Sequence, residues 1–163
     1  MAYQIFKSNK SATGMCCNFA VNVDDLCFYI NLQRQVKWEN NQGSFKGGKR
    51  VAVKMKPDEI GAILVCIQRN FDQEMVHRTD AAMTNIFFQK LFKYDAETKT
   101  YTKDQVGYYI SVTRTPKEGE KETFRIGFNY GESEVLRQYL IWGLGLIFAE
   151  QTRKQAESRP AKS

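Results

Sequence analysis

Residues 49–70 read KRVAVKMKPDEIGAILVCIQRN, a strand joined to a helix through a proline. From Arg50 to Lys56 basic and apolar residues alternate, which predicts a half-buried strand with a basic outer face. Pro57 suits the first turn of a helix because it fixes φ and has no N–H to satisfy, and the two acids that follow it complement the helix N-terminus. Apolar residues then recur at i, i+3, i+4 and i+7 from Ile60, a stripe that must pack on another surface. The stretch therefore predicts a strand, a tight turn and a helix that crosses a sheet.

Three further strand patterns precede this unit, and the same order recurs in the second half of the chain. The expected strands of the first half are Ala2 to Ser8, Gly14 to Asn22, Leu26 to Val36 and Arg50 to Lys56, with a polar, glycine-rich loop from Lys37 to Gly48. Those of the second half are Glu74 to Thr79, Thr84 to Tyr94, Gln105 to Thr115 and Glu122 to Asn129, and a helix follows from Gly131 to about Gln151. The pattern predicts an α+β fold of tandem ββββα-ββββα order, with two antiparallel four-stranded sheets and packed helices.

The length of 163 residues is that of one domain. We expect residues 1–151 to form it from two halves, 2–70 and 74–151. Residues 152–163 contain no apolar side chain larger than alanine, so they are expected to form a disordered basic tail.

The last expected helix is apolar on nearly all sides, which predicts burial on more than one side. Gly143 and Gly145 are costly in a helix interior and predict close approach by another element. Two interpretations stay open: a core helix within the monomer, or a core helix that also seals a subunit interface. In the second, Tyr139, Trp142 and Leu146 are the expected interface residues.

The four cysteines have no CxxC spacing and lie in apolar strand or helix patterns, which predicts free, buried thiols in a reducing compartment. The first ten residues contain no apolar run of signal-peptide length, and the longest apolar run, Tyr139 to Ala149, is too short for a membrane span. We therefore expect a cytoplasmic or nucleoid-associated protein without membrane partners.

Basic charge is unevenly distributed along the chain. Residues 1–56 carry nine Lys and Arg against three acids, residues 57–151 eleven against fourteen, and residues 152–163 four against one. The basic first half and tail favour partners that carry phosphates.

Catalytic and metal-binding patterns are weak. The single histidine, His77, has no cysteine or serine motif near it, so neither a nucleophile nor a base can be nominated. Asp24 and Asp25 are adjacent acids of a kind that is usually solvated in a turn, and the KGGK sequence at Lys46 precedes a strand instead of the helix that a phosphate loop needs. We therefore expect no enzyme activity, no metal and no cofactor.

Basic and aromatic residues interleave on the expected strands, a pattern typical of single-stranded nucleic-acid binding, in which cations track phosphates and rings stack on bases. An ordinary solvated sheet face is the alternative. Alternation does not fix the face of Lys7, Lys90 and Lys93. The candidate site residues are Lys7, Lys10, Tyr29, Arg34, Lys37, Trp38, Arg50, Lys54, Lys56, Lys90, Lys93, Tyr109 and Arg125.

The ββββα-ββββα order, the stretch KRVAVKMKPDEIGAIL and the final strand and apolar helix together resemble the Whirly fold. Plant Whirly single-stranded DNA-binding proteins and trypanosomatid guide-RNA-binding proteins share this fold, and PC4-type coactivators and their phage counterparts are more distant relatives. The best local match is Val51 to Leu64. The lysine-glycine-lysine-alanine motif of the plant family is only echoed by Lys7 to Ala12, where the glycine is missing, so the motif's role in higher-order assembly does not carry over.

The resemblance implies a homo-oligomer, a tetramer with a dimer as the alternative, that binds single strands along its sheets. The expected function is sequence-tolerant single-stranded DNA binding in replication, recombination, repair or transcription. An RNA-binding or annealing factor on the same fold is one alternative. A structural or protein-interaction module that binds no nucleic acid is the other.

Overall fold

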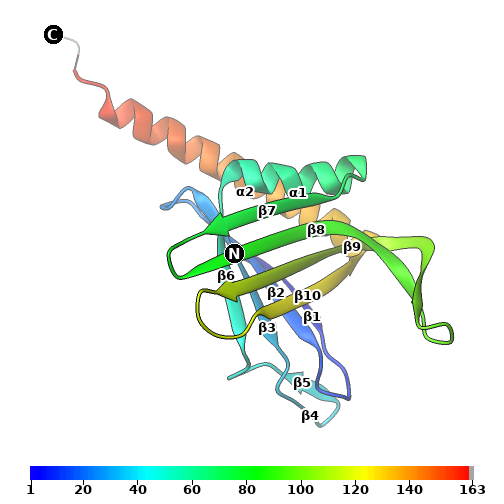
Figure 1. The fold of residues 1–163 in the computed structure, drawn as a ribbon. Helices are drawn as coiled ribbons and strands as arrows, with labels where there is room; N and C mark the ends of the chain where they lie inside the picture. Colours follow the sequence, from blue (N-terminus) through cyan, green and yellow to red (C-terminus); the bar gives the residue numbers. More distant parts are fainter. Residues whose placement is uncertain (162–163) are drawn as a thin grey trace.

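The computed structural model describes residues 1–161 and contains ten strands and two helices (Figure 1). Their bounds are β1 Ala2–Lys7, β2 Met15–Asn22, β3 Cys27–Arg34, β4 Lys37–Glu39, β5 Gln42–Ser44, β6 Arg50–Met55, α1 Pro57–Arg69, β7 Gln73–Arg78, β8 Ala82–Asp95, β9 Thr100–Pro116, β10 Glu122–Asn129 and α2 Tyr130–Ser158. The predicted α+β class and the order of the eight main strands and two helices are confirmed.

The eight main strands form two antiparallel four-stranded sheets. The N-terminal sheet has the order β1-β2-β3-β6 and the C-terminal sheet the order β10-β9-β8-β7. The two orders are equivalent, because each runs through its half of the chain strand by strand. The sequence therefore encodes the same sheet twice.

The hydrophobic core lies between the inner faces of the two sheets and the helices. Phe19 of the N-terminal sheet meets Phe128 of the C-terminal sheet with ring centroids 6.1 Å apart. Both helices bridge the two halves: α1 contacts β7 and β8 of the C-terminal sheet as well as β3, and α2 contacts β9 and β10 of its own half as well as β2. Because each helix touches both sheets, the two halves share one core.

The strand and helix of residues 49–70 form as their sequence predicts. Val51, Val53 and Met55 are buried, and α1 begins at Pro57. The Glu59 carboxylate accepts a hydrogen bond from the Lys56 backbone N–H at 3.0 Å, which caps the first turn. Asn70 ends the helix in the left-handed conformation, with φ of 60°.

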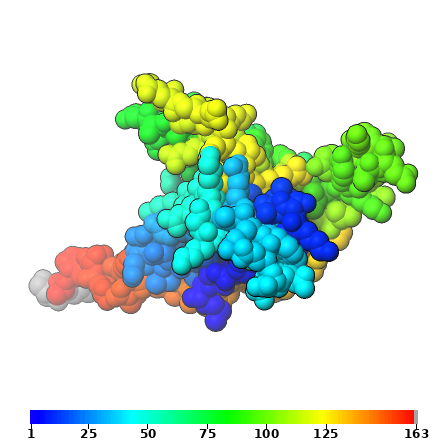
Figure 2. Space-filling model, turned by 90° about the horizontal axis from the view of Figure 1, so that it is seen from below, coloured from blue at the N-terminus to red at the C-terminus, as the bar shows by residue number. Residues whose placement is uncertain are grey.

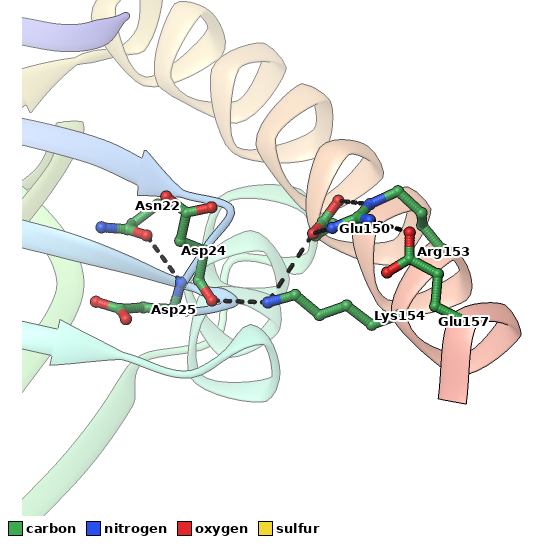
Figure 3. A network of polar contacts seen from close by, with 7 residues as sticks. All are labelled: Asn22, Asp24, Asp25, Glu150, Arg153, Lys154 and Glu157. Atoms are coloured by element: carbon green, nitrogen blue, oxygen red, sulfur yellow. Dashed lines mark hydrogen bonds and ion pairs between the residues drawn. The ribbon is translucent and has the colours of Figure 1, made fainter. Parts of the chain in front are cut away.

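Helix α2 is longer than the sequence predicts. It continues to Ser158, whereas we expected it to end near Gln151 and a disordered tail to follow. Residues 152–158 are mostly good helix formers, and Arg153 pairs with Glu150 and Glu157 one turn to either side (Figure 3). Residues 162–163 of the predicted tail lie outside the described residues.

The end of α2 is also fastened to the N-terminal sheet. Lys154 Nζ donates a 2.9 Å hydrogen bond to the Asp24 carbonyl in the β2–β3 turn (Figure 3). In the same turn the Asn22 side chain accepts from the Asp25 N–H at 2.8 Å. Asp24 and Asp25 therefore belong to a structured turn that receives the helix.

Two hairpins depart from the predicted strand pattern. Part of the expected loop of residues 37–48 is the short β4–β5 hairpin, which turns at Asn40 and Asn41 in the left-handed conformation. Strand β9 begins at Thr100, five residues before its predicted start, whereas β8 ends at Asp95, one residue past its predicted end. The two strands project from the body opposite the end of α2 (Figure 2). Residues 100–104 are mostly polar, so the sequence does not show that β9 extends through them.

Among residues 1–161, no helix is long and apolar enough to cross a membrane.

Candidate nucleic-acid interface

The outer face of the N-terminal sheet carries its side chains in three cross-strand rows, which follow from the strand register. Each row runs from β1 through β2 and β3 to β6. The first row is Ala2, Ala20, Tyr29 and Lys54; the second is Gln4, Asn18, Asn31 and Ala52; the third is Phe6, Cys16, Gln33 and Arg50. The first row ends at β6 with Lys54 and the third with Arg50, and the amides of Asn18 and Asn31 lie at the centre of the face.

Arg50 and Lys54 are exposed, and neither takes part in a salt bridge within residues 1–161. Tyr29 lies directly across from Lys54, and its hydroxyl donates to the Asp25 carboxylate at 2.7 Å. This hydrogen bond raises the pKa of Tyr29 to about 12. The phenol therefore stays neutral and fixed beside a free ammonium group.

The outer face of the C-terminal sheet has its own cation and aromatic cluster. The Arg125 guanidinium lies 3.9 Å from the ring centroid of Tyr109 and 5.8 Å from that of Tyr101. The Tyr109 hydroxyl donates to Gln89 Oε1 at 2.5 Å, which holds the ring in place. A guanidinium that lies over a ring keeps N–H donors that the ring does not use, so it can still bind a phosphate.

Three of the predicted basic residues are instead engaged within the fold. Lys7 pairs with Glu132 of α2 at 2.6 Å, and Lys37 pairs with Glu39 at 2.9 Å. Arg34 lies at the end of β3 on the side facing the other sheet, where it donates to the Thr123 carbonyl at 2.8 Å and covers the Phe124 ring at 4.5 Å. The expected outward position of Arg34 is wrong, because the alternation of β3 turns it toward β10.

The remaining predicted residues are scattered. Lys10 is exposed in the β1–β2 turn, Lys56 precedes α1, and Trp38 is half-buried in the β4–β5 hairpin. Lys93 is exposed on the projecting β8–β9 hairpin. Lys90 lies opposite buried Tyr108, so it shares the helix-facing side of the sheet and not the outer face.

Several residues of the outer faces were missed by the sequence reasoning. Phe6 is 59 % exposed, and Phe45 of the segment after β5 lies beside it. The amides of the second row were also missed, although strand alternation placed Asn18 and Asn31 on the polar face. A search for charged and aromatic residues alone passes over such neutral hydrogen-bonding groups.

Helix α2 presents an apolar face to solvent. Trp142 and Leu146 lie on it with relative exposures of 44 % and 36 %, beside exposed Ile141 and Phe148. Tyr139, also expected at an interface, instead packs within the subunit: its hydroxyl donates to the Met1 carbonyl and accepts from the Val21 N–H, both at 3.0 Å. Gly143 approaches Phe28 closely, as predicted, whereas Gly145 faces open space.

The cysteines are free: Cys17, Cys27 and Cys66 are buried, and Cys16 is half-buried on the outer face of the N-terminal sheet. The expectation that all four are buried is therefore wrong for Cys16, whose strand alternates between core and outer face.

No family model matches the sequence, and no curated relative does. Solved structures do match. A guide-RNA-binding protein complex bound to a guide RNA is 16 % identical, with a TM-score of 0.63, and the match covers 88 % of this chain and 89 % of that one. The WHY3 protein of Arabidopsis thaliana is 10 % identical with a TM-score of 0.65, covering 96 % and 93 %. The plant transcriptional regulator PBF-2 is 12 % identical with a TM-score of 0.61, covering 99 % and 90 %.

Each match covers most of this chain and most of the solved structure, but the sequence identity is too low to align residues by sequence. The matches agree with the two equivalent sheets and the two helices that bridge them. The chain therefore has the fold shared by the Whirly proteins and the guide-RNA-binding proteins.

Proposed function

We propose that this protein binds single-stranded nucleic acid, single-stranded DNA first, on the outer faces of its two sheets. The observation that carries the proposal is the pair of cation–aromatic sites, Lys54 beside Tyr29 on one face and Arg125 on Tyr109 on the other. Cations that follow the backbone and rings that receive unpaired bases are the components of sequence-tolerant strand binding.

The names of the structural neighbours support the proposal at the level of class. One is a guide-RNA-binding complex and another a plant transcriptional regulator. The first favours RNA as a second candidate ligand, because a fold that holds guide RNA accommodates a 2′-hydroxyl. We also propose, from the same class of structural neighbours, a role in replication, recombination, repair or transcription. We propose that the protein has no enzyme activity.

We also infer that the working form is a homo-oligomer, a tetramer with a dimer as the alternative. Trp142, Leu146, Ile141 and Phe148 are large apolar side chains exposed close together along one helix, and exposed apolar groups of this kind mark interfaces in soluble proteins. A symmetric assembly through α2 would leave the outer sheet faces free for a strand.

Fluorescence anisotropy with matched oligo-dT and oligo-U strands over a series of salt concentrations tests the proposal. Arg50→Gln, Lys54→Gln and Arg125→Gln should each weaken binding and reduce the slope of log K against log salt by about 0.7, the value for one phosphate contact on a single strand. Arg137→Gln is the control, since it removes a half-buried cation from α2 that pairs with Glu134 and lies on neither sheet face.

Tighter binding of oligo-U than of oligo-dT would favour the RNA alternative. No binding to either strand at low salt would contradict the proposal and favour a protein-interaction module.

A further inference from the structure

The projecting end of the β8–β9 hairpin, residues 92–104, is called the arm below (Figure 2). The pairing of the hairpin shifts register at the base of the arm, between Leu91 and Phe92 and again between Phe92 and Tyr94. Both shifts place extra residues on β9, because its partners step from Gly107 to Gln105 and then to Tyr101. Bulges of this kind bend a strand and redirect its side chains, so the arm does not continue the straight course of the sheet.

The bend brings Tyr101 of the arm to the outer face of the C-terminal sheet. The Arg125 guanidinium lies 3.9 Å from the ring centroid of Tyr109 and 5.8 Å from that of Tyr101. Tyr101 lies at the start of β9 and Tyr109 near its middle. A straight strand rises about 3.3 Å per residue, so it would hold these rings too far apart for one guanidinium to reach both. The arm therefore continues the cation and aromatic cluster of the outer face.

A second exposed ring lies beside Tyr101 on the arm. Tyr94 is its cross-strand partner, and the two ring centroids are 5.3 Å apart. The two tyrosines are 52 % and 57 % exposed, so neither ring is buried in the core. Exposed aromatic groups that lie together mark binding surfaces. Tyr109, Arg125, Tyr101 and Tyr94 thus form a continuous series that leads from the sheet onto the arm.

The arm offers rings without an excess of cations. Its charges balance, three lysines against three acids: Lys93, Lys99 and Lys103 against Asp95, Glu97 and Asp104. Its tip is ordered, because the Asp95 carboxylate accepts hydrogen bonds from the Glu97 and Thr98 N–H groups at 2.9 Å and 3.4 Å. A surface held in place in this way loses little conformational freedom when it binds.

We propose that the arm extends the strand-binding surface of the C-terminal sheet. Arg125 binds a phosphate, and two neighbouring unpaired bases of the same strand stack on Tyr101 and Tyr94. Stacking on a ring requires only the flat face of a base, so the arm accepts any base. The inference rests on the proposed function and adds to it a segment that lies outside both sheet faces.

Anisotropy titrations of oligo-dT with Tyr94→Ala and Tyr101→Ala test the arm. Each variant should bind about tenfold more weakly, as loss of one base stack allows. The slope of log K against log salt should not change, because neither ring binds a phosphate, whereas Arg125→Gln should lower both affinity and slope. Tyr94→Phe and Tyr101→Phe keep the rings and should rescue the loss, since stacking does not use the hydroxyl groups.

Phe71→Ala is the matched control, because Phe71 is an aromatic residue with a similar exposure of 60 % in the connection between α1 and β7. Wild-type affinity in both alanine variants would overturn the role of the arm, while weaker binding by Arg50→Gln and Lys54→Gln would leave the sheet faces in place. A lower particle mass of the alanine variants without a strand would assign the arm to a contact with a second copy instead. Absence of strand binding by the wild type would overturn the proposed function as well.

A measurement on the unaltered protein guards against misfolded variants. An oligo-dT strand that carries iododeoxyuridine is photocrosslinked to the wild type, and the product is digested with trypsin. Cleavage after Lys93, Lys99 and Lys103 places Tyr94 and Tyr101 in separate peptides, residues 94–99 and 100–103. Both peptides should carry the crosslink. The peptide of residues 126–137, which contains exposed Tyr130 of α2, should not. Crosslinks that spare both arm peptides would overturn the proposal.

Discussion

Gly143 is the position on α2 where one methyl group decides how closely the helix and the N-terminal sheet pack. A Cβ atom there would lie 2.5 Å from Phe28 Cζ and 3.3 Å from Val21 Cβ. Gly143→Ala should therefore lower the free energy of unfolding by about 1–3 kcal/mol, the usual cost of overpacking a core. Urea denaturation measures the change.

Gly145 provides the matched control two residues along the same helix. A Cβ atom there meets nothing within 4 Å, so Gly145→Ala should raise the free energy of unfolding by up to about 1 kcal/mol through helix propensity alone. Equal stability of the two variants would contradict the assigned packing.

Tyr29 gives a titration that reports on the β2–β3 turn. Its pKa of about 12 lies above the ordinary value of 10, because its hydroxyl donates to Asp25. A folded-state pKa raised in this way contributes stability that is fully present below pH 10 and is lost as the pH rises through 12. NMR titration of the phenol carbon should show the pKa of Tyr29 falling toward 10 in Asp25→Ala, and an unchanged pKa would mean that the hydrogen bond does not form.

At the scale of elements, the sequence predicted the strands and helices in which buried and exposed residues alternate with a regular period. The β6–α1 unit and β10 form as predicted, because alternation and helical spacing directly record which side faces the core. Alternation along β3 places Arg34 on the same side as buried Leu32, but the sequence could not show its contact with Phe124, which depends on how the two sheets meet. Nor could it show the end of α2, because no apolar stripe marks residues 152–158, and helix propensity and charge pairs extend the helix there.

The site was predicted in part for the same reason. Arg50, Lys54, Tyr109 and Arg125 lie on outer faces as expected, because each alternates with buried neighbours on its own strand. The contact between Phe6 and Phe45 joins segments far apart in sequence and required the fold.

The extended end of α2 leads to a prediction about binding. Deletion of residues 152–163 removes four cations, of which Arg153 is already paired with Glu150 and Glu157. We expect weaker binding and a salt slope flatter by about one unit, without complete loss. Anisotropy titrations at several salt concentrations measure both. Complete loss of binding would place the site on the tail instead of the sheets.

At the scale of the whole molecule, the apolar residues of α2 remain exposed to solvent in a single subunit. Trp142→Glu puts a charge on this face, and we expect smaller particles by light scattering, because burying an unpaired carboxylate is costly. Long strands that bridge subunits should then bind less tightly, and short strands should lose less. Gln155→Glu, an exposed position farther along the same helix, is the control. A wild-type mass of 18.9 kDa at micromolar concentration would refute the assembly.

The packing of both helices across the two halves has a consequence for cutting the chain. Only residues 70–72 join α1 to β7, and Asn70 is held by Tyr108 at 2.9 Å and by Gln105 at 3.0 Å, whereas Phe71 is exposed. Two fragments that part after Phe71 each lack one of the two helices of the shared core until the other fragment binds. Co-expressed, they should reassemble into one particle that unfolds in a single transition, and each alone should aggregate. The two fragments could then be used as a split protein, in which the folded particle forms only when both fragments are present.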